Sequence, residues 1–300
     1  MLKRIILFCA ALIAVFGLSA CGTTSQSVAV EKKILLVAGK PSHGPGDHEF
    51  NAGCMLLAKC LNETPGIKAT VAKGGWPADE SAFDGIDAVF FYMDGGPGHP
   101  VARPEHIKKV RELAAKGVGI GFGHYAVEVV PGEPGDAWKE WIGGHYEDHY
   151  SVNPMWSPEY KTFPKHPVAN GVKPFSNRDE WYFNIRWRSN TNGITPILVA
   201  HPSDQVRKGP YVYPAGPYQH IIDAAGRDET LMWVVENANH QRGFGFTGGH
   251  THKNWGDENQ RKVVLNALVW IAHGKVPKDG IQSTVTPEDL AANLDDKRRR

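Results

Sequence analysis

VGIGFGHYA, residues 118–126, is a short apolar run that ends in a sharp turn. Val118–Phe122 has no polar side chain, which is typical of a strand buried on both faces of a sheet. The glycine at position 123 and the histidine at 124 then predict an abrupt change of chain direction. Three similar runs come before it, at Lys33–Gly39, Ile67–Ala72 and Ala88–Met93. We expect these four runs to be strands of one parallel sheet.

Helical patterns separate these runs. One covers about residues 49–61, and another begins at a proline and covers residues 104–116, with Ile107, Val110 and Leu113 on one face and charged side chains on the other. Strands that alternate with helices through short loops are typical of a parallel sheet covered on both sides. The sequence therefore predicts an α/β, flavodoxin-like fold.

The second half of the chain is less regular. Residues 147–222 are rich in aromatic residues and prolines, and we interpret them as an insertion or antiparallel extension rather than a separate domain. Short strands are expected there at Thr195–Ala200, Tyr211–Tyr213 and Gln219–Asp223. Regular structure returns with strands at Met232–Glu236 and Gly243–Thr247 and a helix at Asn259–His273. Residues 276–300 have few apolar side chains, so we expect a polar, frayed tail.

Composition excludes two classes of protein. The 300 residues carry 33 basic and 32 acidic side chains, a formal net charge of +1. A nucleic-acid binder would normally show a strongly basic domain or stripe, so we expect no nucleic-acid partner. A hydrophobic content of 41% with almost no net charge also argues against intrinsic disorder.

The N-terminus resembles a bacterial lipoprotein leader. Lys3 and Arg4 precede an apolar run that ends in Leu-Ser-Ala before Cys21, and a polar stretch follows. We expect residues 1–20 to be a signal peptide, Cys21 the lipidation site, 21–31 a linker and 32–275 the folded domain. The protein would then be lipid-anchored in the cell envelope, on the periplasmic side or at the outer membrane. The alternatives are an ordinary cleaved signal and a buried N-terminal helix.

The two other cysteines of the predicted mature chain, Cys54 and Cys60, lie six residues apart in a predicted helix. Their Cα atoms would be about 9 Å apart at the helical rise per residue, which is beyond disulfide reach. We expect buried free thiols.

Histidine is frequent, with 14 in the chain, and many follow predicted strands. Ligands of doubly wound sheets bind at the carboxyl ends of the strands, where the connecting loops meet. Four such loops carry histidine or aspartate: His43 and His48, Asp94 and His99, His124, and His250 and His252. A parallel sheet brings these loops to one edge, although any single histidine is more often a cap, a surface residue or a hydrogen-bonded core residue.

A further pair, His145 and His149, has the i, i+4 spacing that places two side chains on one face of a helix. This spacing suits joint metal binding. The remaining histidines have no such placement, and we expect them to be structural or at the surface: His106, His166, His201, His220, His240 and His273.

Two chemistries fit a histidine-lined edge. Neutral imidazoles and a carboxylate can hold a zinc-type divalent ion, which activates water or polarises a carbonyl group. Histidines can also work without metal as general acid and base near neutral pH. Acidic residues that could complete either site are Asp47, Glu49, Asp94, Glu128, Glu147, Asp148 and Glu180.

The turn at residues 121–126 has the strand-to-turn character of a nucleophile elbow, but its central residue is His124 rather than serine or cysteine. This substitution argues against a triad hydrolase or a glutaminase. The glycine-rich loops lack the spacing of a Walker A or dinucleotide-binding motif.

Together these pieces resemble the ThuA-like (trehalose utilisation) family, whose fold is similar to that of the class I glutamine amidotransferases without their cysteine. The resemblance extends from about Lys33 to Gly274. The motifs that carry it are the His43–His48 loop, the elbow at His124, Gly143–His145 leading to His149, His166–Val168, Asp179–Tyr182, and Gly248–His250. The lead-in to the last strand, residues 239–243, departs from the family pattern, and residues 150–230 do not align.

The resemblance implies a role in carbohydrate catabolism, in the same pathway as an oxidoreductase that converts a sugar hydroxyl to a ketone. Oxidation at C3 of a glycoside acidifies the C2 hydrogen, so that a base can remove it and the anomeric group can leave. We therefore expect a lyase or hydrolase acting on 3-keto glycosides. The rivals are a carbohydrate-binding lipoprotein without catalysis and a subunit of a sugar-degrading complex.

Each candidate residue is given a role on this reading. Catalysis is assigned to His124, His43, Glu180 and Asp94. A divalent metal ion is assigned to His48, His149, His250 and His252. Contacts with a small carbohydrate are assigned to Trp156, Trp181, Trp255 and Asn254, with core packing as the alternative for the tryptophans.

Overall fold

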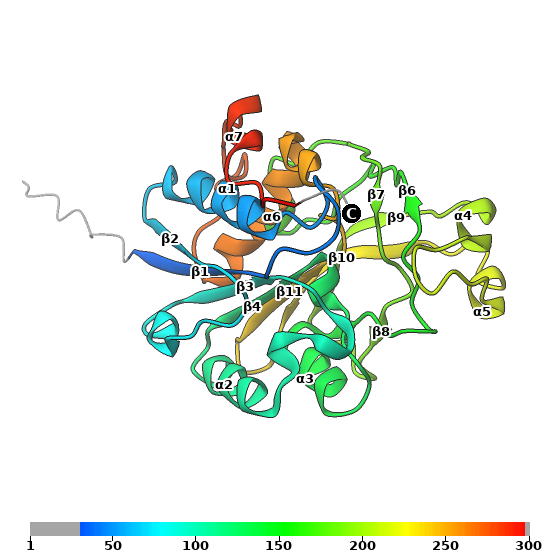
Figure 1. Cartoon of the computed structure of the whole chain (residues 1–300), viewed down its shortest axis with the longest axis horizontal. Helices are drawn as coiled ribbons and strands as arrows, with labels where there is room; N and C mark the ends of the chain where they lie inside the picture. The colour runs from blue at the N-terminus through cyan, green and yellow to red at the C-terminus, as the bar shows by residue number, and fades with distance from the viewer. Residues whose placement is uncertain (1–30, 298–300) are drawn as a thin grey trace, which may run out of the picture. The chain divides into compact units, whose positions relative to one another are not determined.

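The computed structural model describes residues 31–297, so the predicted signal peptide, Cys21 and most of the linker lie outside the described residues. A seven-stranded sheet forms the centre of this part of the chain (Figure 1). Its strands are β1 (Lys32–Ala38), β2 (Ile67–Ala72), β3 (Ala88–Tyr92), β4 (Gly119–Gly123), β9 (Ile194–Ala200), β10 (Glu229–Glu236) and β11 (Arg242–Phe246).

The strand order is β2-β1-β3-β4-β11-β10-β9. The first five strands are parallel, in the order expected of a flavodoxin-like fold. Strand β10 runs antiparallel to both β11 and β9, so the sheet is mixed rather than wholly parallel. The predicted fold class is confirmed for the five parallel strands, and the antiparallel extension is the pair β9 and β10.

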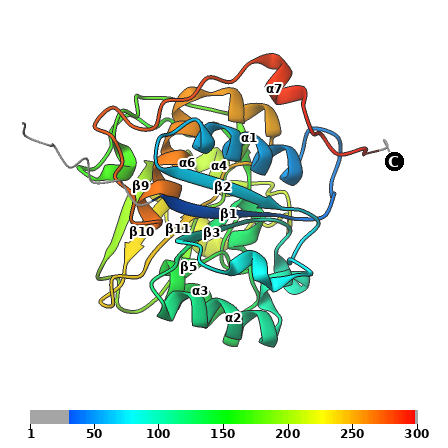
Figure 2. The same ribbon diagram turned by 90° about the vertical axis from the view of Figure 1, so that its left-hand side faces the viewer.

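Helices cover both faces of the sheet (Figure 2). One layer contains α1 (Phe50–Asn62) and α6 (Glu258–Ile271), and the other contains α2 (Pro104–Ala115) and α3 (Glu133–Ile142). Side chains of β1 alternate between the two layers: Ile34 and Leu36 belong to the core under α1 and α6, whereas Leu35 and Val37 belong to the core over α2 and α3. This alternation explains why the strand is apolar at every position from Ile34 to Ala38.

Glycine in β4 leaves room for a large side chain of the neighbouring strand. A Cβ atom at Gly121 would lie 2.3 Å from the ring of Phe244 on the neighbouring β11. The glycine-rich strand is therefore a packing requirement, and it leads directly into the short helix η4 (His124–Val127).

The insertion contains small elements. Two-residue strands pair antiparallel, β5 (Gly144–His145) with β8 (Arg186–Trp187) and β6 (Met155–Trp156) with β7 (Asp179–Glu180). The short helices are α4 (Asp204–Lys208) and α5 (Gln219–Ile222). The strand predicted at 219–223 is thus wrong, since that segment is helical, and residues 211–213 form no strand.

The predicted frayed tail is also wrong for its described part. Val276 and Ile281 are buried in the core beside α6, and Asn266 accepts a hydrogen bond from the Ile281 amide at 2.8 Å. The helix α7 (Pro287–Ala291) follows, with a capping box formed by Thr286 and Asp289. Few apolar residues are present, but they occupy the positions that pack.

Cys54 and Cys60 are buried free thiols, as predicted. No helix among residues 31–297 is long and apolar enough to cross a membrane.

Candidate functional site

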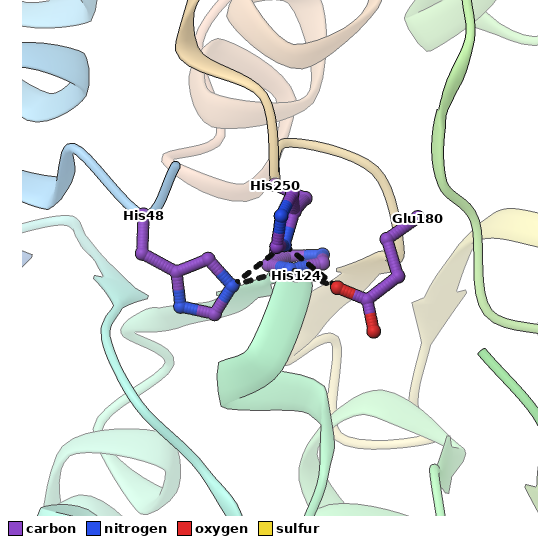
Figure 3. Close-up of side chains that lie close together, drawn as sticks. All are labelled: His48, His124, Glu180 and His250. Atoms are coloured by element: carbon purple, nitrogen blue, oxygen red, sulfur yellow. Dashed lines mark hydrogen bonds and ion pairs between the residues drawn. The ribbon is translucent and has the colours of Figure 1, made fainter. Parts of the chain in front are cut away.

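Four side chains converge at the carboxyl edge of the sheet (Figure 3). His48 follows β1, His124 follows β4, His250 follows β11, and Glu180 comes from β7 in the insertion. One donor atom from each lies within 4.8 Å of the others. We call this group the His3Glu cluster.

The donor atoms of the His3Glu cluster are close to one another. The Nε2 atom of His48 lies 3.0 Å from Nε2 of His124 and 2.9 Å from Nδ1 of His250. A carboxylate oxygen of Glu180 lies 2.7 Å from Nδ1 of His250 and 3.6 Å from Nε2 of His124. His124 is fully buried, and Glu180 is 4% exposed.

The outer ring nitrogens face oxygen atoms, and these contacts fix which nitrogen carries the proton. Nδ1 of His124 lies 3.0 Å from the carbonyl oxygen of Thr247, which can only accept a hydrogen bond. Nδ1 of His48 lies 3.2 Å from the carboxylate of Asp94. A neutral ring held in this way carries its proton on Nδ1 and leaves Nε2 as an acceptor, and the two Nε2 atoms lie 3.0 Å apart. A cation between them would satisfy both acceptors.

Burial and neighbouring charges control protonation here. Burial, with the neighbouring His124, lowers the pKa of His48 far below its usual range. Burial raises the pKa of Glu180, but hydrogen bonds and charge from His124 and His250 outweigh it and lower this pKa to about 2. Burial lowers the pKa of His250, but the hydrogen bond and charge of Glu180 and the charge of Asp47 outweigh burial. The pKa of His250 is therefore raised above its usual value. The cluster thus contains an ionised carboxylate beside a His48 ring that resists protonation.

Two of the three histidines of the His3Glu cluster have a backbone conformation that is unusual for residues with a side chain. The φ angles of His48 and His124 are 47° and 52°. Such strain persists only where the surrounding structure enforces it, and it is concentrated at functional sites. At His124 the strained turn connects β4 to η4, so the predicted elbow aims an imidazole ring into the cluster.

The loops after β1 and β11 are joined to each other. The amide of His48 donates to the carbonyl of His250 at 2.9 Å, and the amide of His252 donates to the carbonyl of Gly46 at 2.9 Å. These two hydrogen bonds hold two loops together that lie about 200 residues apart in sequence.

The insertion supplies the fourth donor and a buried support. Glu180 accepts a hydrogen bond from Asn153 at 2.8 Å. Its neighbour Asp179 is fully buried and accepts from the amides of Gly249 and Thr251, both at 2.9 Å. The sequence places Asp179 in the Asp179–Tyr182 motif but indicates no role for it. Its place directly before Glu180 in that motif is the sequence signal that points to it.

His43 and Asp94 lie beside the cluster and are more open to solvent, with 42% and 40% of their side chains exposed. The ring centroid of His43 is 3.6 Å from that of His48, and its Nδ1 lies 3.8 Å from Asp94. Ser42 donates to Asp94 at 2.8 Å and lies 3.0 Å from Nδ1 of His43. Asp94 thus contacts both His43 and His48.

Two predicted metal ligands are not in the His3Glu cluster. His252 begins the short helix η6 (His252–Gly256), which turns its ring toward the tail, where Nε2 meets the Leu290 carbonyl at 3.0 Å. His149 is exposed in a turn and contacts the Tyr218 hydroxyl at 3.3 Å. Its partner His145 is fully buried and belongs to the short strand β5, so the i, i+4 pair shares no face.

The predicted carbohydrate-stacking residues are in the core. Trp181 and Trp255 are fully buried, Trp156 is 6% exposed, and the Asn254 amide donates to the Arg178 carbonyl at 2.9 Å. Trp181 and Trp255 therefore present no face to solvent, and the packing alternative describes them.

Two tyrosines near the cluster are given no role by the sequence, and Glu128 is one of the acids that the sequence names as possible partners. The Tyr182 hydroxyl lies 3.4 Å from Nε2 of His124, and the Tyr125 ring centroid lies 5.8 Å from that of His48. Glu128 is 7% exposed, and its burial, together with charge from Asp148, raises its pKa to about 8.

Comparison with known proteins identifies the family and agrees with the fold. The model of the ThuA family, described as trehalose utilisation, matches residues 33–271. The chain belongs to the ThuA family. Solved structures of ThuA-like proteins share the fold. One from Bacteroides uniformis has a TM-score of 0.55 and 17% identity, and the match covers 81% of this chain and 92% of that one. One from Parabacteroides merdae has a TM-score of 0.53 and 16% identity, covering 86% and 94%.

A shorter match is to the chloroplastic carbamoyl phosphate synthase small chain of Oryza sativa subsp. japonica. It is 37% identical over 86 residues, which is 28% of this chain. The match spans only 18% of that protein's length.

In this ThuA-family chain the His3Glu cluster could hold a metal ion. Zinc-type ions prefer imidazole and carboxylate donors at about 2.0–2.1 Å, which places tetrahedral donors about 3.3 Å apart. The measured separations of 2.7, 2.9, 3.0 and 3.6 Å lie around that value. The outer-nitrogen contacts to Thr247 and Asp94 are also of the kind that orients metal-binding histidines. The donor set therefore fits a zinc-type divalent ion.

Proposed function

We propose that this ThuA-family protein is an enzyme of carbohydrate catabolism that acts on 3-keto glycosides with a divalent ion in the His3Glu cluster. The observation that carries the proposal is the close approach of Nε2 of His48 to Nε2 of His124, 3.0 Å apart, beside an ionised Glu180. When bound, a divalent ion supplies charge that polarises a ketone oxygen of the substrate.

The chemistry requires one base at the edge of the cluster. Removal of the C2 proton of a 3-keto glycoside leaves an electron pair that forms a double bond between C1 and C2. The C1–O bond to the leaving group breaks, and the departing alcohol takes up a proton. Subsequent addition of water would make the overall reaction a hydrolysis, and without it the enzyme is a lyase.

His43 is the base that the geometry favours. Its ring is 42% exposed, so a substrate can reach it, whereas His124 is fully buried with its inner nitrogen facing the other donors. His124 is thus better suited to bind the ion than to move a proton. Asp94 lies close enough to His43 to orient the ring and stabilise the imidazolium that forms when the proton is taken.

We also propose the cellular setting predicted from the sequence. The leader motif before Cys21 supports export and lipid anchoring in the cell envelope. The near-zero net charge is compatible with a small neutral carbohydrate ligand. Because the substrate carries a ketone, an oxidoreductase acting on a sugar hydroxyl must supply it.

Metal analysis of the purified protein, combined with turnover of a 3-keto glucoside, tests the proposal. We expect one divalent ion per chain, and we expect His124→Ala to lose both the ion and turnover. His240→Ala is the matched control, since that ring is 86% exposed. Turnover by metal-free protein would contradict the role of the ion and favour acid–base catalysis by histidine alone. Binding of sugar without turnover or metal would favour the carbohydrate-binding rival and contradict the enzyme.

A further inference from the structure

The C-terminal segment of the described chain lies against both loops that carry cluster histidines. In Figures 1 and 2 it follows α7 and passes the loop that leads from β1 to α1. At one end of the segment, the Leu290 carbonyl lies 3.0 Å from Nε2 of His252, two residues after His250. At the other end, Lys297 reaches the backbone of His48. We call residues 286–297 the strap.

The side chain of Lys297 is buried although Lys297 is the last described residue. Its side chain is 4% exposed, and its ammonium group lies 3.3 Å from a carboxylate oxygen of Glu49, which is 1% exposed. The same ammonium donates hydrogen bonds to the carbonyl oxygens of Asp47 and His48, the latter at 3.1 Å. A buried lysine costs desolvation free energy unless it is paired and hydrogen-bonded, and Lys297 satisfies both conditions.

These contacts fall on the strained turn. The φ angle of His48 is 47°, and the two carbonyl groups that Lys297 contacts are those of the strained residue and of the residue before it. Glu49 completes the arrangement. One of its oxygens accepts from the Gly46 amide at 2.9 Å, and the other accepts from the Asp295 amide at 2.9 Å.

A second tie comes from α1. The Asn51 side chain donates to the Asp295 carboxylate at 2.7 Å. The strap is therefore attached to the turn and to the first helical turn after it, rather than through one exposed contact.

We propose that Lys297 is a positioning residue, by which the strap holds the turn at His48 in the conformation that directs its ring into the His3Glu cluster. The expected effect on metal binding rests on the metal-dependent function proposed above, whereas the effect of Lys297 on the turn at His48 does not. Lys297 contacts the backbone of His48 and not the ion itself. Its loss is therefore expected to weaken metal affinity about tenfold, the lower end of the range for residues that support metal ligands.

The test compares Lys297→Met, which keeps the aliphatic stem, with Lys297→Arg, which keeps the positive charge. Lys278→Met is the control, because Lys278 is exposed in the same C-terminal region. Hydrogen exchange measured by mass spectrometry follows peptides covering residues 44–52 and 248–254 in metal-free protein. Zinc affinity comes from competition with a chromogenic chelator, and the absorption spectrum of bound cobalt reports ligand geometry.

We expect Lys297→Met to increase exchange in these two peptides but not in peptides from β3 and β4. Zinc binding should weaken about tenfold, the cobalt spectrum should change, and Lys297→Arg should restore both. Unchanged exchange at residues 44–52, or an equal increase in β4, overturns the positioning role. Absence of zinc binding by the unmodified protein would instead contradict the metal-dependent function, and the exchange result would still decide the role of Lys297.

Discussion

His48 and His124 show how one residue type acquires a defined role through its outer nitrogen. Each ring has one nitrogen directed at an oxygen acceptor and the other at the cluster. The acceptor determines the tautomer, so Asp94 and the Thr247 carbonyl take part in the site without facing its centre.

Asp94→Asn is expected to weaken zinc affinity about 10- to 100-fold, because an amide is a weaker acceptor for the Nδ1 proton of His48. Chelator competition measures the change. The control is Asp84→Asn, at an exposed aspartate remote from the cluster. Equal affinities for Asp94→Asn and the unmodified protein would contradict the tautomer argument.

The substitution His43→Ala tests whether His43 acts as the base and not as a metal ligand. It should lower turnover of a 3-keto glucoside by about 10²- to 10⁴-fold, the usual contribution of a general base, with metal content unchanged. Steady-state kinetics and metal analysis on the same sample give both values. Loss of the metal together with turnover would place His43 among the ligands instead.

At the scale of elements, the parallel strands and the insertion each supply part of the site, and they differ in how well the sequence predicts that part. The strand ends supply His48, His124 and His250, and this much follows from a strand pattern and from the rule that ligands bind at carboxyl ends. Glu180 depends on the β6–β7 pair, which consists of two-residue strands without a periodic pattern. The sequence therefore identifies Glu180 as a candidate acid but does not predict that it lies in the His3Glu cluster.

Asp179 links the insertion to the β11 loop, and Asp179→Asn tests that link. The amide replaces one acceptor oxygen with a donor beside the amides of Gly249 and Thr251. We expect a loss of about 1–3 kcal/mol in the free energy of unfolding, as for other buried groups left without a partner. Urea denaturation measures it. Asp228→Asn is the control, since that carboxylate is 68% exposed and should change stability by less than about 1 kcal/mol.

For the whole molecule, the clearest difference between prediction and structure is which histidines belong to the site and which belong to the core. His99 and His145 were singled out by position or spacing, yet both are buried in the core. Their distance from the cluster depends on tertiary packing under α3, which spacing does not encode. The tail shows the same limit, because the burial of Lys297 depends on Glu49, almost 250 residues earlier.

Burial lowers the pKa of both His99 and His145 to about 4, and this makes stability depend on pH. In the unfolded chain each titrates near 6.5, so below that pH the unfolded state binds protons that the folded state does not. Stability should therefore fall as the pH falls from about 6.5 toward 4. Each residue contributes about 2 kcal/mol of that loss between pH 7 and 5.

His145→Leu isolates one of these contributions. Neither ring nitrogen of His145 meets the geometry of a hydrogen bond among the described residues, and its one charged neighbour there is the Glu147 carboxylate, 3.5 Å from Nε2. An apolar side chain of similar size therefore fits the position. Urea denaturation at pH 7 and 5 should show a pH-dependent loss smaller by about 2 kcal/mol than in the unmodified protein. An unchanged difference between the two pH values would contradict the buried neutral histidine.

The joined loops after β1 and β11 have a consequence for the order of events during folding. The contacts of His48 with His250 and with Lys297 span 202 and 249 residues. A folding chain can pair β1 with β3 early, but it has no complete ligand set until β11 and the loop after it are in place. Ion capture is therefore expected to be a late event, and a chain that stops before β11 would have strand ends without a binding site.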